Sequence, residues 1–574
     1  MKHLVILCML ASLLCSCGDI GGTAPGPDMD TIVDEDWGDT VPRDAESGDL
    51  GDVDDVVLDE ADICTIEWTA VACTDHSQCD DNVFCNGEER CGKYEYGYVC
   101  YRSTCHKPCE AAPGEDPACH PCVCIEDQQM LAYPLKDSDG DGYVDMACAG
   151  DDCDDSDKNA HPGMADLCDS LDNNCNALVD EDGWKQPDGL EVANPVSSAA
   201  AASSHHAIVS LDDTWQAAWL EDDGESFTIR FAGIAYDVDE EEVTVESRDL
   251  WVVSGSDADD ITISDLSIIG SAGSYYVAWV ESAPDGDSVR IKRHDTDPAI
   301  PPGTLFESDT RIYETVIKNL HGSSVSAGLL FRMAADDDSG DFEIYYVPVA
   351  DFTDDPPEEP AAPTRLTQAT GFSGNPDAAP LPDGGWMVVW EDERDGNKEI
   401  YLRKIDFEGN PDPGMRMARR LTDAPVESQE PAIARMGTGA SEEYAVVWTD
   451  GRNGVFEIYS MIVDGGGDQV SPELVHPSPS ENAWQAAVIA DADRQQYMVA
   501  YSAGTFMRYD IYMTFTDRET PRGLESRTVR TSEASLTKPV MATNCCDDVV
   551  AMLWQEIVRG SSPSIHLEIL QCTN

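Results

Sequence analysis

Residues 137–145 carry an acidic motif whose oxygen atoms are spaced to surround a metal ion. The candidate ligands at relative positions 1, 3, 5, 7 and 9 are Asp137, Asp139, Asp141, the backbone carbonyl of Tyr143, and Asp145. Gly142 stands at position 6, where such a loop turns sharply. Hard oxygen ligands at this spacing are typical of a calcium loop. Because Cys148 replaces the usual glutamate at position 12, further ligands are expected from Asp152, Asp154, Asp155 and Asp157.

A second copy of this spacing follows, with weaker ligands. Its candidate ligands are Asp172, Asn174, Asn176 and Asp180. Two carboxylates have become amides and the glycine has become Ala177, so we expect weaker calcium binding here than in the first loop. Four cysteines interleave with the two loops and can close them as two disulfides: Cys148, Cys153, Cys168 and Cys175.

The whole stretch resembles the metal-binding motif family of bacterial surface proteins. The matching segments are Asp152-Cys153-Asp154-Asp155, Pro162-Gly163 and the run from Cys168 to Glu181. The resemblance implies metal binding, and one member of the family binds copper. Oxygen ligands favour calcium over copper on grounds of softness, so calcium is expected and copper stays the alternative. His161 is the one nitrogen ligand nearby, and we interpret it as an exposed turn residue.

The N-terminus is typical of an export signal. Lys2 precedes the apolar run 4–14, which is too short to span a bilayer. The run ends in Leu14-Cys15-Ser16-Cys17-Gly18, which resembles a bacterial lipobox and implies that residues 1–17 form a lipoprotein signal with Cys17 as the lipidated residue. An ordinary cleaved signal is the alternative. We expect an exported bacterial lipoprotein held to the outer membrane or cell surface through its lipid.

Export explains the 21 cysteines, which in an oxidising compartment indicate disulfides. Residues 18–62 are predicted to be a disordered acidic tether. Residues 63–130 are predicted to form a small disulfide-stapled module, similar to a cysteine-rich repeat of secreted myxobacterial proteins. The alternative there is a zinc site drawn from Cys105, His106, Cys109, Cys119, His120, Cys122 and Cys124. Residues 131–184 hold the acidic motif.

Residues 185–574 repeat one phrase seven times, an apolar run that ends in an aromatic residue and is followed by an acidic turn and a second strand. The aromatic residues, 52 to 60 positions apart, are Trp219, Trp279, Phe331, Trp390, Trp448, Tyr501 and Trp554. This period predicts an all-β fold, a seven-bladed propeller. The last repeat lacks a fourth strand, so we expect 189–194 to supply it and close the ring. Cys572 is expected to pair with Cys545 or Cys546.

The composition narrows the function. A net charge of −77 argues against nucleic acid as a partner, and the sequence contains no nucleophile elbow, phosphate-binding loop or His-Glu-x-x-His motif. Asp392 with Arg394, and Asp450 with Arg452, repeat by blade and are predicted to serve the blades. We therefore predict that the protein is not an enzyme. We expect a calcium-stabilised, surface-anchored binding or adhesion lipoprotein that binds an extracellular protein or glycan. The alternatives are a sialidase-like glycoside hydrolase and a copper- or metal-binding surface protein.

Overall fold

The computed structural model describes separate ranges of the chain between Ile66 and Cys572. These ranges are 66–72, 89–94, 97–103, 119, 123–125, 130–132, 134–167, 171–176, 183–187, 190, 192–211, 214–237, 242–254, 261–271, 274–319, 326–335, 341–349, 362–436, 442–478, 482–491, 496–505, 508–516, 526–543 and 549–572. Several predicted residues lie outside them: Cys17, Cys168, Asp180, Cys545 and Cys546, and, from the alternative zinc set, Cys105, His106, Cys109, His120 and Cys122. Within these ranges, no helix is both long and apolar enough to span a bilayer.

The chain divides into two compact units, which are described separately. In the unit that ends at His161, β1 (Ile66–Ala72), β2 (Glu89–Tyr94) and β3 (Gly97–Ser103) form an antiparallel sheet of order β1-β3-β2. The strands β4 (Val123–Ile125) and β5 (Met130–Ala132) form a two-stranded sheet, and η4 (Met146–Cys148) is a single turn of 3₁₀ helix. The predicted boundaries at 63–130, 131–184 and 185–574 stay predictions.

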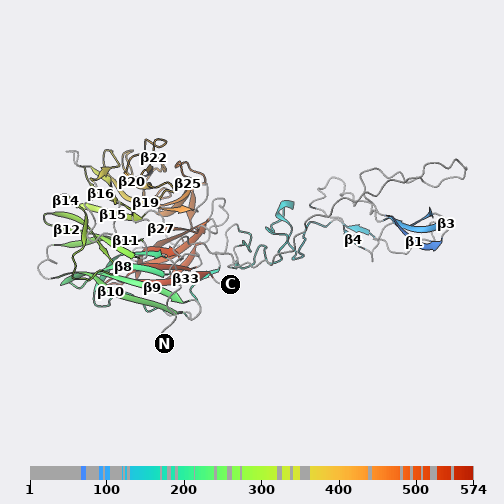
Figure 1. Cartoon of the computed structure of the whole chain (residues 1–574), viewed down its shortest axis with the longest axis horizontal. Helices are drawn as coiled ribbons and strands as arrows, with labels where there is room; N and C mark the ends of the chain where they lie inside the picture. The colour runs from blue at the N-terminus through green and yellow to red at the C-terminus, as the bar shows by residue number, and fades with distance from the viewer. Residues whose placement is uncertain are drawn as a thin grey trace, which may run out of the picture. The chain divides into compact units, whose positions relative to one another are not determined.

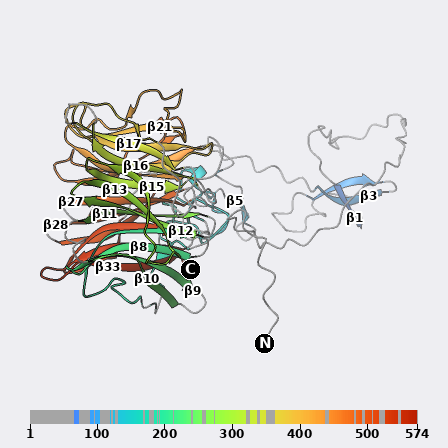
Figure 2. The same cartoon turned by 60° about the vertical axis from the view of Figure 1, so that its left-hand side comes forward.

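The second unit, from Pro162 onward, contains seven four-stranded antiparallel sheets, which we call blades one to seven (Figures 1 and 2). Blade one consists of β7 (Ala202–Leu211), β8 (Thr214–Asp222), β9 (Ser226–Asp237) and β10 (Glu242–Ser254), and blade two of β11 (Thr262–Ser271), β12 (Ser274–Ala283), β13 (Gly286–Arg293) and β14 (Gly303–Ser308). Blade three consists of β15 (Ile312–Asn319), β16 (Ala327–Ala334), β17 (Phe342–Val349) and β18 (Thr364–Arg365), and blade four of β19 (Ser373–Pro380), β20 (Trp386–Asp392), β21 (Glu399–Ile405) and β22 (Arg419–Arg420).

Blade five consists of β23 (Ser428–Met436), β24 (Glu443–Asp450), β25 (Glu457–Asp464) and β26 (Leu474–His476), and blade six of β27 (Asn482–Asp491), β28 (Gln496–Thr505), β29 (Arg508–Thr516) and β30 (Arg527–Arg530). Blade seven consists of β31 (Ser535–Thr543), β32 (Val549–Ile557), β33 (Ser564–Cys572) and β6 (Trp184–Lys185). The first strands of neighbouring blades touch one another, from β7 and β11 round to β31 and β7. The ring is therefore closed, and the predicted seven-bladed propeller is confirmed.

The core lies between the blades. The second strand of each blade is covered on both faces, and all seven residues of β20 are buried. The seven predicted aromatic residues all lie on second strands, and each is at most 1% exposed. A strand covered on both faces favours a continuous apolar run over alternation, which is why the repeat was visible in the sequence.

The strand that closes the ring differs from the prediction. The backbone of β6 pairs with β33, with Trp184 opposite Cys572, so the last blade takes its outer strand from 184–185 and not from 189–194. The predicted segment still lies along β33. The Asn194 side chain donates to the Leu567 carbonyl and accepts from the Leu567 amide, at 2.8 Å each. Pro195 has no N–H that could donate to a neighbouring strand, so the Asn194 side chain makes the hydrogen bonds to β33 here.

In blades four and five, a buried aspartate is paired with polar groups of its own blade. In blade five, Trp448 Nε1 and Ser428 Oγ donate to Asp450 Oδ2 at 3.0 and 2.9 Å, and Arg452 Nη2 donates to the same oxygen at 2.6 Å. Asp392 and Arg394 repeat the pair in blade four. Burial by itself would raise the pKa of Asp450, but the hydrogen bonds from Arg452 and Trp448 lower it overall. These residues thus serve the blades, as their repetition indicated.

We expect Asp450→Asn to lower the free energy of unfolding by about 2 kcal/mol, because it breaks a buried, hydrogen-bonded ion pair. Because the folded state holds the pKa of Asp450 below its usual value, the stabilisation is present above about pH 4 and is lost as the pH falls through the lowered pKa. Urea unfolding at pH 7 and pH 3 measures this. Asp423→Asn, whose carboxylate is 91% exposed, is the control; equal effects of the two substitutions would contradict the assignment.

Candidate functional site

The acidic loop 137–143 is organised by its own backbone. Asp137 accepts hydrogen bonds from the amides of Gly140 (2.8 Å) and Gly142 (3.2 Å), and Asp141 accepts one from Tyr143 (2.7 Å). Gly142 has φ = 101°, a conformation that a side chain would strain, so the glycine at position 6 is required by the turn. These contacts turn three carboxylates toward one another.

The three carboxylates form one cluster with ligand geometry. Asp137, Asp139 and Asp141 each place an oxygen within 4.8 Å of the other two. The Oδ2 atoms of Asp139 and Asp141 are buried and accept no hydrogen bond. Like charges held this close repel one another, so a divalent cation among them would be strongly stabilising.

Asp152 adds a fourth carboxylate to this region. Backbone hydrogen bonds between Asp152 and residues 144 and 146 return the chain alongside the loop. The Asp152 side chain is fully buried, and its Oδ2 accepts no hydrogen bond. Burial raises the pKa of Asp152, and the charges of Asp141 and Asp139 raise it further. A buried carboxylate oxygen without a donor is costly unless a cation neutralises it.

The remaining predicted ligands of the first loop are engaged elsewhere. Lys136 Nζ lies 2.5 Å from Asp145 Oδ2 and 2.8 Å from Asp155 Oδ2. The hydrogen bond from Lys136 holds the pKa of Asp155 at about 2. Asp154 and Asp157 accept hydrogen bonds from the residues two positions on, Ser156 and Asn159. Of the predicted ligands, the described residues therefore bring together Asp137, Asp139 and Asp141, and Asp152 lies close enough for the charges of Asp141 and Asp139 to act on its pKa.

His161 is placed differently from our interpretation. Its ring stacks on Tyr143 with centroids 4.3 Å apart, and its side chain is only 18% exposed. Its Nε2 lies 4.0 Å from Asp141 Oδ2. A turn residue is thus packed against the acidic loop, because the tyrosine ring at position 7 gives it an apolar surface to cover.

The second loop is described only in part, over residues 171–176. The side-chain oxygens of Asp172 and Asn174 both accept from the Asn176 amide, at 3.2 and 3.1 Å. Asp180 lies outside the described residues, as does Ala177. Two carboxylates replaced by amides leave less charge to hold a cation, so weaker binding stays the prediction.

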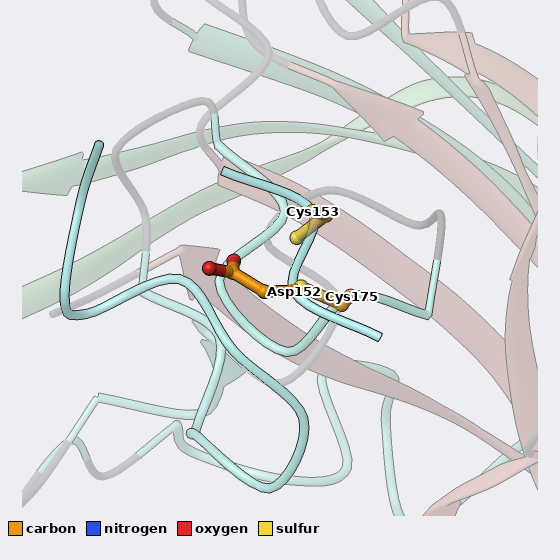
Figure 3. Close-up of side chains that lie close together, drawn as sticks. All are labelled: Asp152, Cys153 and Cys175. Carbon is orange, nitrogen blue, oxygen red and sulfur yellow. The ribbon is translucent and has the colours of Figure 1, made fainter. Parts of the chain in front are cut away.

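The cysteines form disulfides, but not in the arrangement expected. Cys148 is bonded to Cys119, so the four cysteines of the motif do not close on one another as two bonds. Cys153, Cys175 and Cys572 are also disulfide-bonded. Figure 3 draws Asp152 with Cys153 and Cys175; because both sulfurs are oxidised, neither is a thiolate ligand. Cys119 is likewise removed from the alternative zinc set.

A second constellation, which the sequence did not reveal, lies on the first strands of the propeller. Each of these strands has a β-bulge that holds one non-glycine residue at φ between 47° and 57°. The bulge residues are His205, Asp265, Glu314, Asn375, Glu430, Gln485 and Lys538. All seven are polar and lie 14 to 18 residues before the aromatic residue of their blade, which is the signal that could have found them. Left-handed conformations cost such residues about 1 kcal/mol or more each.

The bulges connect the blades. Glu314 accepts a hydrogen bond from the Asn375 amide (2.6 Å), Glu430 accepts one from Gln485 (3.3 Å), and Gln485 accepts one from Lys538 (2.9 Å). Each donor is the bulge residue of the next blade. The left-handed backbone turns its amide toward the neighbouring blade, where the side chain of the preceding bulge accepts it.

Three carboxylates of blades three to five gather at this level. Glu391, fully buried at the end of β20, accepts from the Glu430 amide (2.9 Å) and pairs with Lys398 (2.7 Å). Glu314 pairs with Arg332 at 2.9 Å. Burial raises the pKa of Glu314 and of Glu430, and the negative charge of Glu391 raises both further. Since first strands begin where second strands end, all three lie at one end of the propeller.

Comparisons with known proteins found similarities to the metal-binding motif and to the propeller. Residues 152–181 match the family model described as "Putative metal-binding motif", and no curated protein matches the chain. Among solved structures, a Penicillium chrysogenum alpha-L-arabinanase complexed with arabinobiose is 11% identical, with 58% of this chain and 96% of that chain covered and a TM-score of 0.35. The β-propeller domain of the Trilobed protease from Pyrococcus furiosus is 8% identical, with 65% and 96% covered and a TM-score of 0.35.

A Trypanosoma rangeli sialidase in complex with sialic acid is 10% identical, with 68% of this chain and 59% of that chain covered and a TM-score of 0.32. These findings correct the prediction that the protein is not an enzyme, because the similar propellers include glycoside hydrolases and sialidases. At these identities and TM-scores, the similarity assigns neither an activity nor a substrate to this chain.

Proposed function

We propose that the protein is an exported calcium-binding protein whose cation is held by Asp137, Asp139, Asp141 and Asp152. The observation that carries this is the buried, donor-free oxygen on three of these four carboxylates. Carboxylate oxygens are hard ligands and suit calcium better than copper. The cation would fix the loop to the returning chain segment at Asp152 and so stiffen this region.

Calorimetric titration of the full chain with Ca²⁺ tests the proposal. Asp141→Asn is expected to weaken the tightest site about tenfold or more, since calcium affinity follows the number of charged ligands. Asp152→Asn should weaken it too. Asp157→Asn removes the same charge from a half-buried carboxylate outside the cluster, which accepts a hydrogen bond from the Asn159 amide, and should leave the affinity unchanged.

Equal weakening in all three variants would indicate general electrostatics and overturn the site. Copper that binds more tightly than calcium and resists a calcium chelator would overturn the choice of metal.

We further propose that the chain is anchored by lipid at Cys17. The lipobox-like run 14–18 supports this, and the Cys119–Cys148 disulfide fits an oxidising compartment. Cells expressing the protein and fed radiolabelled palmitate should label the wild type and not Cys17→Ser. Equal labelling of the two would contradict the anchor.

A second candidate function is hydrolysis of a polysaccharide by the propeller, which the carboxylates of blades three to five favour. Glycoside hydrolysis needs one carboxyl group that protonates the leaving oxygen and a second that acts as base or nucleophile. Glu314 and Glu430 are partly exposed and flank the buried Glu391. A burial-raised pKa keeps a carboxyl protonated closer to neutral pH, as a general acid requires.

Release of reducing ends from soluble polysaccharides by the full chain tests this candidate. Glu314→Gln and Glu430→Gln are each expected to reduce the rate by about a hundredfold or more, since a positioned acid or base contributes that much. Glu427→Gln, an exposed residue of the loop before β23, is the control. Wild-type protein that releases no reducing ends, or variants that match the control, would contradict this candidate.

A further inference from the structure

Partly exposed aromatic side chains flank the carboxylates at the same end of the propeller. Tyr313 immediately precedes Glu314 on β15 and is 38% exposed. Trp484 immediately precedes Gln485 on β27, and its ring lies 4.1 Å from that of Phe456, which precedes β25. The two residues occupy the same position, one before the bulge, in blades three and six.

The two aromatic sites are held rigidly. Arg332 fixes Tyr313, with its guanidinium carbon 4.6 Å from the centre of the tyrosine ring, and it also lies over Phe342 and Phe372 at 4.9 and 4.8 Å. On the other side, the Gln485 amide that follows Trp484 donates to Glu430. Rigid aromatic rings offer contact area with little loss of side-chain entropy.

Apolar side chains extend the surface beside Trp484. Val426 and Val455, 42% and 37% exposed, lie in the connections before β23 and before β25. Val426 and Phe456 come together at Gly451, where a Cβ atom would meet the phenylalanine ring at 3.1 Å and the valine at 3.4 Å. Carboxylates between two apolar platforms match a ligand with both C–H faces and hydroxyl groups, as a sugar has.

The charge of this region decides which sugars fit. Arg332 and Lys398 already pair with Glu314 and Glu391, so they do not offer free positive charge to an anionic ligand. The chain as a whole carries −77 charges, which repel acidic glycans. A neutral glycan brings no charge to be repelled, and its hydroxyl groups can donate to the carboxylates.

We propose that this end of the propeller, from Tyr313 in blade three to Trp484 in blade six, binds a neutral glycan chain across the carboxylates. The proposal rests on the candidate role in polysaccharide hydrolysis and specifies the substrate class and the residues that hold it. Sugar rings stack on Tyr313 and Trp484, while Glu314 and Glu430 face the bonds between them. Trp484 is the main anchor because its ring is the largest and has Phe456 behind it.

Calorimetry of the full chain with three neutral probes, cellohexaose, xylohexaose and mannohexaose, tests the proposal, with hexagalacturonic acid as the anionic comparison. At least one neutral probe is expected to bind more tightly than the anionic one. Trp484→Ala should weaken that binding about tenfold, the usual cost of losing a central aromatic anchor. Trp251→Ala, on the outer strand β10 of blade one, is the matched control and should not change it.

Tyr313→Ala is a second variant, for the case that Trp484→Ala fails to fold. Tyr313 is exposed, so its replacement is expected to leave folding intact, and it too should weaken binding. The proposal is overturned if none of the neutral probes binds, if the anionic probe binds more tightly, or if Trp251→Ala weakens binding as much as the two variants at the site. Binding without release of reducing ends would refute hydrolysis and leave this proposal standing. Hydrolysis that Trp484→Ala and Tyr313→Ala leave unchanged would refute this proposal and leave hydrolysis standing.

Discussion

The propeller depends on the packing of each blade's second strand against both neighbouring blades. A strand such as β20, buried along its whole length, has no face left for water, so every blade needs a neighbour on each side. Seven blades meet this condition only as a ring, and the ring closes because Trp184 and Lys185 add an outer strand to the last blade. Closure therefore requires that residues almost four hundred positions apart pair with one another. In the closed ring, no blade has an unpartnered face.

This packing determines how polar groups are used. A tryptophan buried between blades brings an indole N–H that must find an acceptor. An acidic residue two positions later supplies it in four of the blades, and an arginine neutralises the acid in each of them. In these four blades the charge of the buried acid is thus balanced within the blade.

At one end of the ring, strain and charge occur together. The first strands bulge, their polar bulge residues take left-handed backbone conformations, and carboxylates from blades three to five lie close enough to influence one another. Strained residues persist only where the surrounding structure holds them, and such sites are often functional. The acidic loop at residues 137–141 is a separate case. Its geometry comes from local hydrogen bonds and from the return of the chain at Asp152.

The sequence by itself determined the features that repeat or that act over a few residues. The seven aromatic residues predicted the blade number, because each lies in the same buried strand. The spacing of Asp137, Asp139 and Asp141 predicted a ligand cluster, since a turn at Gly142 brings neighbours in sequence together. The tertiary structure alone decided which distant residues meet. Lys136 takes Asp145 and Asp155 away from the cluster, Cys148 pairs with Cys119, and β6 rather than 189–194 closes the ring. The carboxylates Glu314, Glu391 and Glu430 come from three blades, and only the closed ring brings them to one end, because sequence spacing carries no information about contacts between blades.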